Sequence, residues 1–276
     1  MSELFAIING IKICYKIKGD GYPVILIHGF AKKEFWVCQI DELSKTFKVI
    51  WYDNRGVGKS DRPNEPYTME LLADDLKGLM DFLGINKAHM IGHSLGGMVL
   101  QHFALKYPKH LNKLVLISTN AGTPDKAAIE MFKNNQIALY ETRLNDPEKA
   151  FYNKMKGRVT RKFLKMMQED PKRKFHGSFS AEDLMLNDNI EPWRPQDIIN
   201  HANALANHHI LNRLHDIKNE TLILTADKDR ITPKIESEQM HEKMPKSKLK
   251  VFSGGHYFPL EVAPEVNQVI LEFLKG

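Results

Sequence analysis

Apolar residues gather along this chain in six short, largely unbroken runs that are separated by longer stretches of mixed character. The runs are rich in Val, Ile and Leu, as expected for strands buried on both faces of a sheet. They cover residues 24–29, 47–53, 88–94, 113–119, 220–227 and 248–253. Apolar positions recur at helical spacing over residues 69–83, 95–107, 234–244 and 264–274. This alternation predicts an α/β fold, a mostly parallel sheet with helices on both faces.

The N-terminal residues follow a different pattern. Two β-rich runs, residues 4–8 and 11–17, are separated only by Asn9 and Gly10. Asn-Gly is the pair that best tolerates the positive φ angles of a type I′ turn. We therefore expect an antiparallel hairpin to open the sheet.

The alternation stops between residues 123 and 213, where helical composition continues without a convincing strand. We interpret this segment as a helical cap inserted into a core domain of residues 1–122 and 214–276. Prolines divide the cap, which predicts several helices rather than one long one. They are Pro124, Pro147, Pro171, Pro192 and Pro195.

Composition places the chain among ordinary globular proteins, with 42% hydrophobic and 26% charged residues in a length of 276. Two cysteines, Cys14 and Cys38, are too few for a disulfide framework. No secretion signal or bilayer-length apolar run is recognisable, so we expect a soluble, cytoplasmic protein that does not bind a membrane. No motif indicates nucleic-acid binding, and the oligomeric state cannot be read from the sequence.

One segment, residues 154–174, is strongly basic, with nine Lys or Arg against two acidic residues. A solvated helix face is the simpler explanation. The alternative is attraction of an anionic substrate or membrane surface.

The sequence Gly92-His93-Ser94-Leu95-Gly96 stands where an apolar run gives way to a helical pattern, which is the context of a nucleophile elbow. A strand that turns directly into a helix brings the flanking backbone together, so positions 92 and 96 can carry no large side chain. Ser94 is therefore the candidate nucleophile. The following helix directs its N-terminal amides at the centre where negative charge develops.

The triplet His28-Gly29-Phe30 follows the first buried run. A tight turn after a buried strand explains Gly29 by itself, but the same turn can present the Phe30 backbone N–H to the serine. We predict that the N–H groups of Phe30 and Leu95 form an oxyanion hole. The His28 ring has no role in this prediction.

A serine hydroxyl needs a base, and His256 is preferred among the twelve histidines. It follows Gly254-Gly255 in a loop after the last predicted strand, at the sheet edge where Ser94 is also expected. His93 is expected to point away from the chemistry. The adjacent pair His208-His209 lacks the i, i+4 spacing of a helical metal site, so no metal is assigned.

The acid should lie between nucleophile and base along the chain, where Asp227 and Asp229 follow a predicted strand. Thr232 is suited to cap the next helix and Pro233 to open it, which leaves Asp229 in the loop. Asp229 is the first candidate and Asp227 the second.

Taken together, these residues resemble the α/β-hydrolase superfamily over nearly the whole chain outside the cap. Residues 52–60, YDNRGVGKS, look like the family's D-x-R-G-x-G-x-S loop. Asp229 followed by Pro233 matches its D-x-x-x-P at the triad acid, which favours Asp229 over Asp227. Ala226 and Glu220 depart from the usual glycine and proline, away from the catalytic groups.

The core is most similar to the enol-lactonase, cofactor-free haloperoxidase and small esterase group. A serine at position 94 argues against haloalkane dehalogenases and epoxide hydrolases, whose elbow carries an aspartate. The resemblance implies a Ser94-His256-Asp229 triad that hydrolyses small-molecule carboxylic esters through an acyl-enzyme, with no cofactor.

Substrate specificity is expected to be set by the cap and by side chains over the elbow, among which we single out Phe30, Met98 and Trp193. Simple packing is the alternative for each of them. A rival function is a lactonase or carbon–carbon bond hydrolase with the same triad, which pocket arginines that pair with substrate carboxylates would favour. A non-catalytic ligand receptor on this fold is a further alternative.

Overall fold

The computed structural model describes residues 2–122 and 125–276, and it contains an eight-stranded sheet in the order β1-β2-β4-β3-β5-β6-β7-β8. The strands are β1 (Leu4–Ile8), β2 (Ile11–Lys18), β3 (Pro23–Ile27), β4 (Lys48–Tyr52), β5 (Ala88–His93), β6 (Leu111–Ile117), β7 (Thr221–Ala226) and β8 (Ser247–Phe252). The strand pairs from β4 to β8 are parallel, and β2 pairs antiparallel with both β1 and β4. The predicted α/β fold is confirmed.

The predicted N-terminal hairpin is also present. Leu4 pairs with Tyr15 and Ile8 with Ile11 in an antiparallel register. Asn9 and Gly10 adopt φ angles of 50° and 83°. Both turn residues therefore have the positive φ that a type I′ turn requires.

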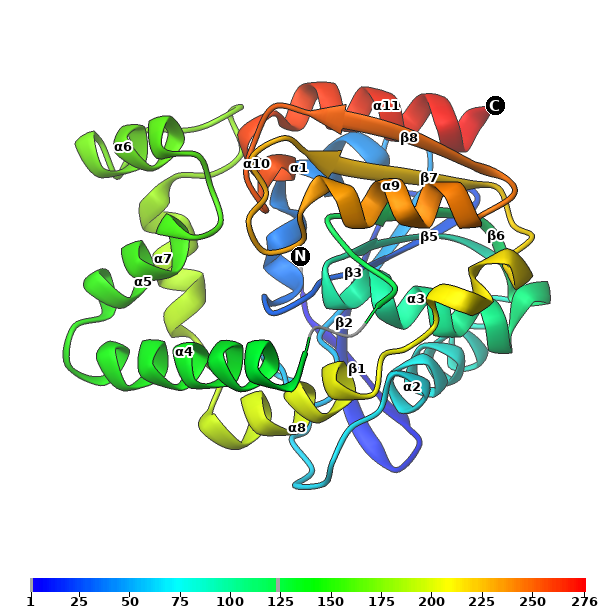
Figure 1. Cartoon of the computed structure of the whole chain (residues 1–276), viewed down its shortest axis with the longest axis horizontal. Helices are drawn as coiled ribbons and strands as arrows, with labels where there is room; N and C mark the ends of the chain where they lie inside the picture. The colour runs from blue at the N-terminus through cyan, green and yellow to red at the C-terminus, as the bar shows by residue number, and fades with distance from the viewer. Residues whose placement is uncertain (1, 123–124) are drawn as a thin grey trace.

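Helices cover both faces of the sheet (Figure 1). The α-helices of the core are α1 (Val37–Leu43), α2 (Met69–Phe82), α3 (Leu95–Lys106), α9 (Lys234–Lys243), α10 (Phe258–Glu261) and α11 (Ala263–Lys275). Short 3-10 helices are η1 (Lys33–Trp36), η2 (Pro108–His110) and η3 (Leu211–Asp216). Side chains alternate along each strand, so Ile25 packs with the α2 and α3 layer while Leu26 packs with the α1 and α11 layer.

Strand β8 departs from the prediction that all six runs are buried on both faces. It is the last strand of the sheet, and Val251 within it is 40% exposed. An edge strand has one neighbour and less cover, so its alternate side chains reach solvent. The sequence of the strand does not reveal its place in the sheet.

The described residues of the predicted cap form five α-helices: α4 (Lys126–Asn145), α5 (Pro147–Lys156), α6 (Arg161–Glu169), α7 (Ala181–Asn189) and α8 (Pro195–Ala206). They follow β6 and precede β7, and in Figure 1 helices α4 to α7 stand beside the sheet. Pro147 and Pro195 open helices, whereas Pro171 and Pro192 follow helix ends, as expected. Pro124 lies outside the described residues, and the boundaries of the cap remain a prediction.

Within the described ranges, every helix is too short or too polar to cross a bilayer.

Candidate active site

The turn between β5 and α3 holds Ser94 in a strained backbone conformation, with φ 55° and ψ −125°. A Cβ on Gly92 would lie 2.6 Å from the carbonyl oxygen of Gly96, and one on Gly96 would overlap the carbonyl oxygen of Ile27. These contacts are the close backbone approach that the sequence led us to expect. Ser94 lies half-buried at the start of the helix.

Strand β6 fixes this turn from the other side. The Ser94 N–H donates to the Ile117 carbonyl over 2.9 Å, and the Thr119 hydroxyl donates to the Ser94 carbonyl over 2.8 Å. The serine backbone is thus held at both ends, which leaves its side chain as the free group of the turn.

The loop after β3 lies directly against the serine. A Cβ on Gly29 would stand 2.7 Å from the Ser94 Cβ and 3.1 Å from the Leu95 nitrogen. Neither the Phe30 nor the Leu95 N–H donates to another group of the described chain. Two unengaged amides beside a serine are what an oxyanion hole needs, although their role remains a prediction.

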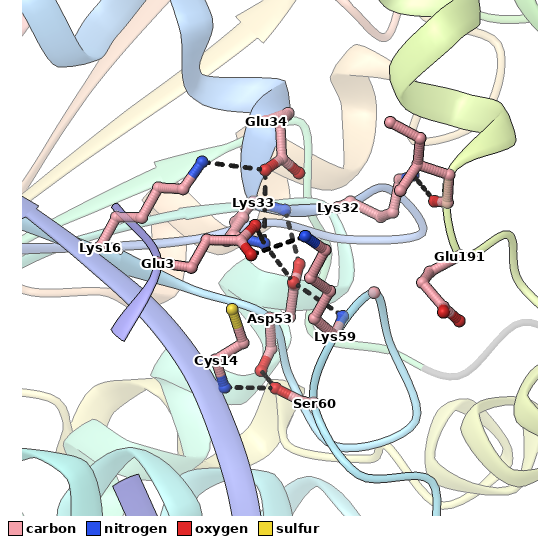
Figure 2. A network of polar contacts seen from close by, with 12 residues as sticks. Glu3, Cys14, Lys16, Lys32, Lys33, Glu34, Asp53, Lys59, Ser60 and Glu191 are labelled. Atoms are coloured by element: carbon pink, nitrogen blue, oxygen red, sulfur yellow. Dashed lines mark hydrogen bonds and ion pairs between the residues drawn. The ribbon is translucent and has the colours of Figure 1, made fainter. Parts of the chain in front are cut away.

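The buried carboxylate of Asp53 holds the loop after β3 in place. It accepts hydrogen bonds from the Lys33 N–H (2.9 Å), the Lys33 Nζ (2.6 Å) and the Lys59 N–H (3.3 Å). Figure 2 shows the Lys33 side chain and the Lys59 backbone directed at this carboxylate. Burial lowers the pKa of Lys33, but the charges of Asp53 and Glu34 outweigh it, so Lys33 stays protonated. Gly58, at φ 52°, leaves room for the carboxylate, and this explains the second of the two glycines in the 52–60 loop.

His256 and Asp229 meet at the carboxyl edge of the sheet. The His256 Nδ1 lies 2.9 Å from the Asp229 Oδ2, and both side chains are buried. Asp229 Oδ1 accepts from the N–H groups of Ile231 (2.9 Å) and Thr232 (3.0 Å). Burial raises the pKa of Asp229, but His256 and these donors outweigh it and hold the pKa below its usual value. The carboxylate therefore stays ionised.

Thr232 has a different role from the one predicted. Helix α9 has Pro233 at its N-cap, with no capping side chain. The Thr232 hydroxyl instead donates to Asp229 Oδ2 over 2.8 Å and lies 3.3 Å from the His256 Nδ1. This hydrogen bond helps to hold the Asp229 carboxylate in place beside His256.

The second candidate acid, Asp227, contacts the loop before the histidine rather than the ring. It accepts from the Gly254 N–H over 3.0 Å and from the Ser253 hydroxyl over 3.4 Å. The structure therefore places Asp229 and not Asp227 beside His256.

The expectation that His93 points away from the chemistry is wrong. Its Nε2–H donates to the His256 carbonyl over 2.9 Å, and the two rings lie 4.8 Å apart. His93 is the last residue of β5, and its side chain reaches the loop of residues 253–257 that carries His256, called the histidine loop below. Burial holds the pKa of His93 well below its usual value, so it packs there as a neutral ring.

Two of the three predicted pocket residues, Phe30 in the loop after β3 and Trp193 of the predicted cap, lie against one another. The rings of Phe30 and Trp193 stack with 4.6 Å between centroids, and the Trp193 Nε1–H donates to the Ala31 carbonyl over 3.1 Å. Phe132 of α4 packs edge-on against Phe30 at 4.7 Å. Met98 is buried one turn into α3. Contact of these residues with substrate remains a prediction.

Sequence reasoning missed Glu261, which joins the histidine loop to the cap. Its Oε1 accepts from the Gly255 N–H over 2.7 Å. Its Oε2 accepts from the Thr160 N–H (3.1 Å) and hydroxyl (2.5 Å). Thr160 and Glu261 stand 101 residues apart in the chain, so no local pattern could have indicated this contact.

The chain matches the family model for the alpha/beta hydrolase fold over residues 22–263, and it belongs to this family. This confirms the resemblance found in the sequence.

Of three similar proteins, two carry the names of hydrolases, and the third that of a bromoperoxidase. A Caulobacter sp. (strain K31) protein provisionally named carbamate hydrolase RutD is 30% identical over 261 residues, which span 93% of this chain and 92% of the relative. An esterase from Thermogutta terrifontis is 28% identical with a TM-score of 0.83, over 100% of this chain and 98% of that one. A bromoperoxidase from Bacillus anthracis is 26% identical with a TM-score of 0.82, over the full length of both chains. Hydrolytic activity is accordingly expected of this chain.

Proposed function

We propose that this protein is a serine hydrolase that cleaves carboxylic esters of small acyl substrates. His256 accepts the Ser94 proton, and the Ser94 oxygen attacks the ester carbonyl. The N–H groups of Phe30 and Leu95 hold the oxyanion, the alcohol leaves with a proton from His256, and water then hydrolyses the acyl-enzyme. Two buried cysteines without a disulfide are in keeping with a reducing, cytoplasmic location.

The observation that carries this proposal is the buried 2.9 Å contact between His256 Nδ1 and Asp229 Oδ2. An ionised Asp229 at Nδ1 keeps the proton there and leaves Nε2 free to accept the serine proton. It also stabilises the imidazolium that forms during attack.

Carbamate hydrolysis is a second candidate, suggested by the provisional name of the Caulobacter relatives. A carbamate carbonyl would be attacked by Ser94 in the same way, with the same oxyanion donors. The two candidates differ in the leaving group and not in the proposed roles of these residues.

The test is hydrolysis of p-nitrophenyl esters from acetate to decanoate and of p-nitrophenyl N-methylcarbamate by purified protein. Ser94→Ala and His256→Ala should each lower kcat by about 10⁴-fold or more, because either change removes the activated nucleophile. Matched controls are Ser2→Ala and His215→Ala, both at exposed positions, which should retain wild-type rates.

Turnover that survives in Ser94→Ala would reject the serine mechanism. A folded wild type that hydrolyses neither class would direct the search to lactones, carbon–carbon bonds or a receptor role. A carbamate rate well above the ester rates would favour the second candidate.

A further inference from the structure

A groove of about 620 Å³ lies between α6 and the end of α10. Four parts of the chain line it: residues 160–166, 173–176, 228 and 253–262. Its volume falls within the range of about 300–1,000 Å³ that is typical of small-molecule sites. The candidate triad lines no part of this groove, so it is distinct from the candidate active site.

Four cationic side chains line the groove. They are Lys162 of α6, Arg173 and Lys174 of the segment after it, and Lys228 of the loop after β7. Lys174 pairs with Asp183 at 2.5 Å. Within the described residues, no ion pair reaches the other three cations. Lys162 and Lys228 are far apart in the sequence, so the fold and not a local run of charge brings them together.

An ordinary solvated helix face would have a different arrangement of charges. On such a face a cation commonly pairs with an acid one turn away, as Lys165 of α6 does with Glu169 at 3.4 Å. Lys162, on the same helix, has no such partner in the part of the chain that the structure describes. Lys228 donates to the uncharged Ser253 hydroxyl over 3.5 Å. The cations of the groove are therefore not neutralised as those of the outer helix face are.

The acidic and imidazole groups of the lining are engaged by their own neighbours. Glu261 accepts from the Gly255 N–H and from the N–H and hydroxyl of Thr160. The His176 Nε2–H donates to the Leu260 carbonyl over 3.1 Å. These contacts leave the unpaired cations as the charged groups that could bind a ligand.

The floor of the groove is apolar. Phe163 and Phe175 line it with 4.5 Å between their ring centroids, and Met166 and Val262 lie beside them. Both phenylalanines are buried, with 7% and 5% of each residue exposed. The Arg173 guanidinium lies over the Phe175 ring, 5.7 Å from its centroid. Exposed cations thus stand above buried aromatic rings, an arrangement that suits a ligand with an anionic head and an apolar body.

A single small molecule fits this arrangement better than a membrane surface does. A helix that binds at a bilayer surface presents protruding apolar side chains to the boundary of the acyl chains. Among the described residues, no exposed large apolar side chain belongs to α6 or to residues 173–176. The apolar groups are recessed in the groove, where a bilayer cannot reach them but the chain of one molecule can.

We propose that this groove binds a single amphiphilic anion, an aliphatic or aromatic chain with a phosphate or carboxylate head. The exposed cations would pair with the head through charge-assisted hydrogen bonds, and the chain would be buried on the apolar floor. Residues that hold the histidine loop also line the groove, so the occupant would lie against that loop.

The first experiment tests both parts of the ligand. Butyl, hexyl and octyl phosphate are titrated into purified protein by calorimetry, below the concentrations at which they form micelles. Kd should fall by about threefold for each added methylene, because the chain is buried. Octyl β-glucoside carries the same chain on an uncharged head and should bind about tenfold or more weakly than octyl phosphate.

Paired variants place the binding in the groove. Lys162→Gln combined with Arg173→Gln should raise the Kd of octyl phosphate by about tenfold or more. Lys156→Gln combined with Lys172→Gln is the matched control. Both control positions are exposed, lie in the same basic segment and do not line the groove. The control removes the same charge and should leave Kd within about threefold.

Methionine methyl resonances give a second readout of the position. Met166 lines the groove, whereas Met98 lies in α3 beside the elbow. With methyl-labelled methionine, octyl phosphate should shift the Met166 signal, assigned from Met166→Leu, and leave the Met98 signal in place. A shift of Met98 alone would place the ligand at the candidate active site and overturn the proposal.

Three further results would contradict it. A Kd independent of chain length would mean that the cations attract any anion, as a solvated face does. Equal losses in the two double variants would assign binding to the overall charge of residues 154–174. Protein that sediments with phosphatidylglycerol vesicles but does not bind octyl phosphate would make the segment a membrane contact. All of these measurements proceed without turnover, so their outcome is independent of the ester and carbamate assays.

Discussion

At some positions around the elbow, the distance to neighbouring atoms determines the residue type, and not a reactive group on the side chain. Gly29 is an example, because its φ lies outside the left-handed region and only the missing Cβ matters. Any side chain there would press on the Ser94 Cβ and on the Leu95 N–H. A glycine in the triplet 28–30 is therefore as much a part of the proposed site as the serine.

Gly29→Ala should lower kcat/KM for ester hydrolysis by about 100-fold, since moving the loop removes one oxyanion donor from its place. Gly122→Ala, where an added Cβ meets no described atom within 4 Å, is the matched control and should be neutral. Steady-state kinetics and a thermal melt of both variants check this. A Gly29→Ala enzyme within threefold of wild type would show that the Phe30 amide does not hold the oxyanion.

At the scale of elements, hydrogen bonds join the predicted cap to the loop that carries His256. Glu261 receives donors from Gly255 of the loop and from Thr160, the N-cap residue of α6. Arg158 and Tyr257 add a backbone hydrogen bond beside it. Displacement of the cap would therefore move the loop that carries His256, which makes the cap part of the proposed catalytic geometry.

Glu261→Gln should lower kcat by about 10- to 100-fold with a smaller change in KM, because one of its two acceptor positions becomes an amide nitrogen that faces donors. Thr160→Val should lower kcat in the same direction, and the double variant should be no worse than Glu261→Gln alone. Glu265→Gln, exposed in the first turn of α11, is the control. Additive losses in the double variant, or a change confined to KM, would mean that the two residues do not position the loop together.

At the scale of the whole molecule, the features that could be predicted from the sequence are those determined by residues that lie close together along the chain. The Asn9-Gly10 turn, the elbow around Ser94 and the loop carrying His256 depend on local patterns. Helix α1 was missed because it has only seven residues, too few for a clear period. The exposure of β8 depends on the order of strands in the sheet, and the contacts of Glu261 and Arg158 depend on how the cap folds back.

Stability against acid should depend on the buried histidines, and His201 is the clearest case. Burial, together with the charges of Arg55 and Arg62, lowers the pKa of His201 to about 3. The Asp197 carbonyl, which accepts the His201 Nδ1–H, acts in the opposite direction. Below about pH 6.5 the unfolded chain binds a proton at this histidine, whereas the folded chain binds it only near pH 3. The free energy of unfolding therefore falls as the pH falls through this window. The slope from this group approaches about 1.4 kcal/mol per pH unit.

His201→Asn keeps a donor for the Asp197 carbonyl but does not titrate. Urea unfolding at several pH values between about 7 and 4.5 should therefore give a shallower decline for the variant than for wild type. Parallel declines would mean that His201 is already protonated in the folded protein, and that the ring cluster with Phe30 and Trp193 carries a charge.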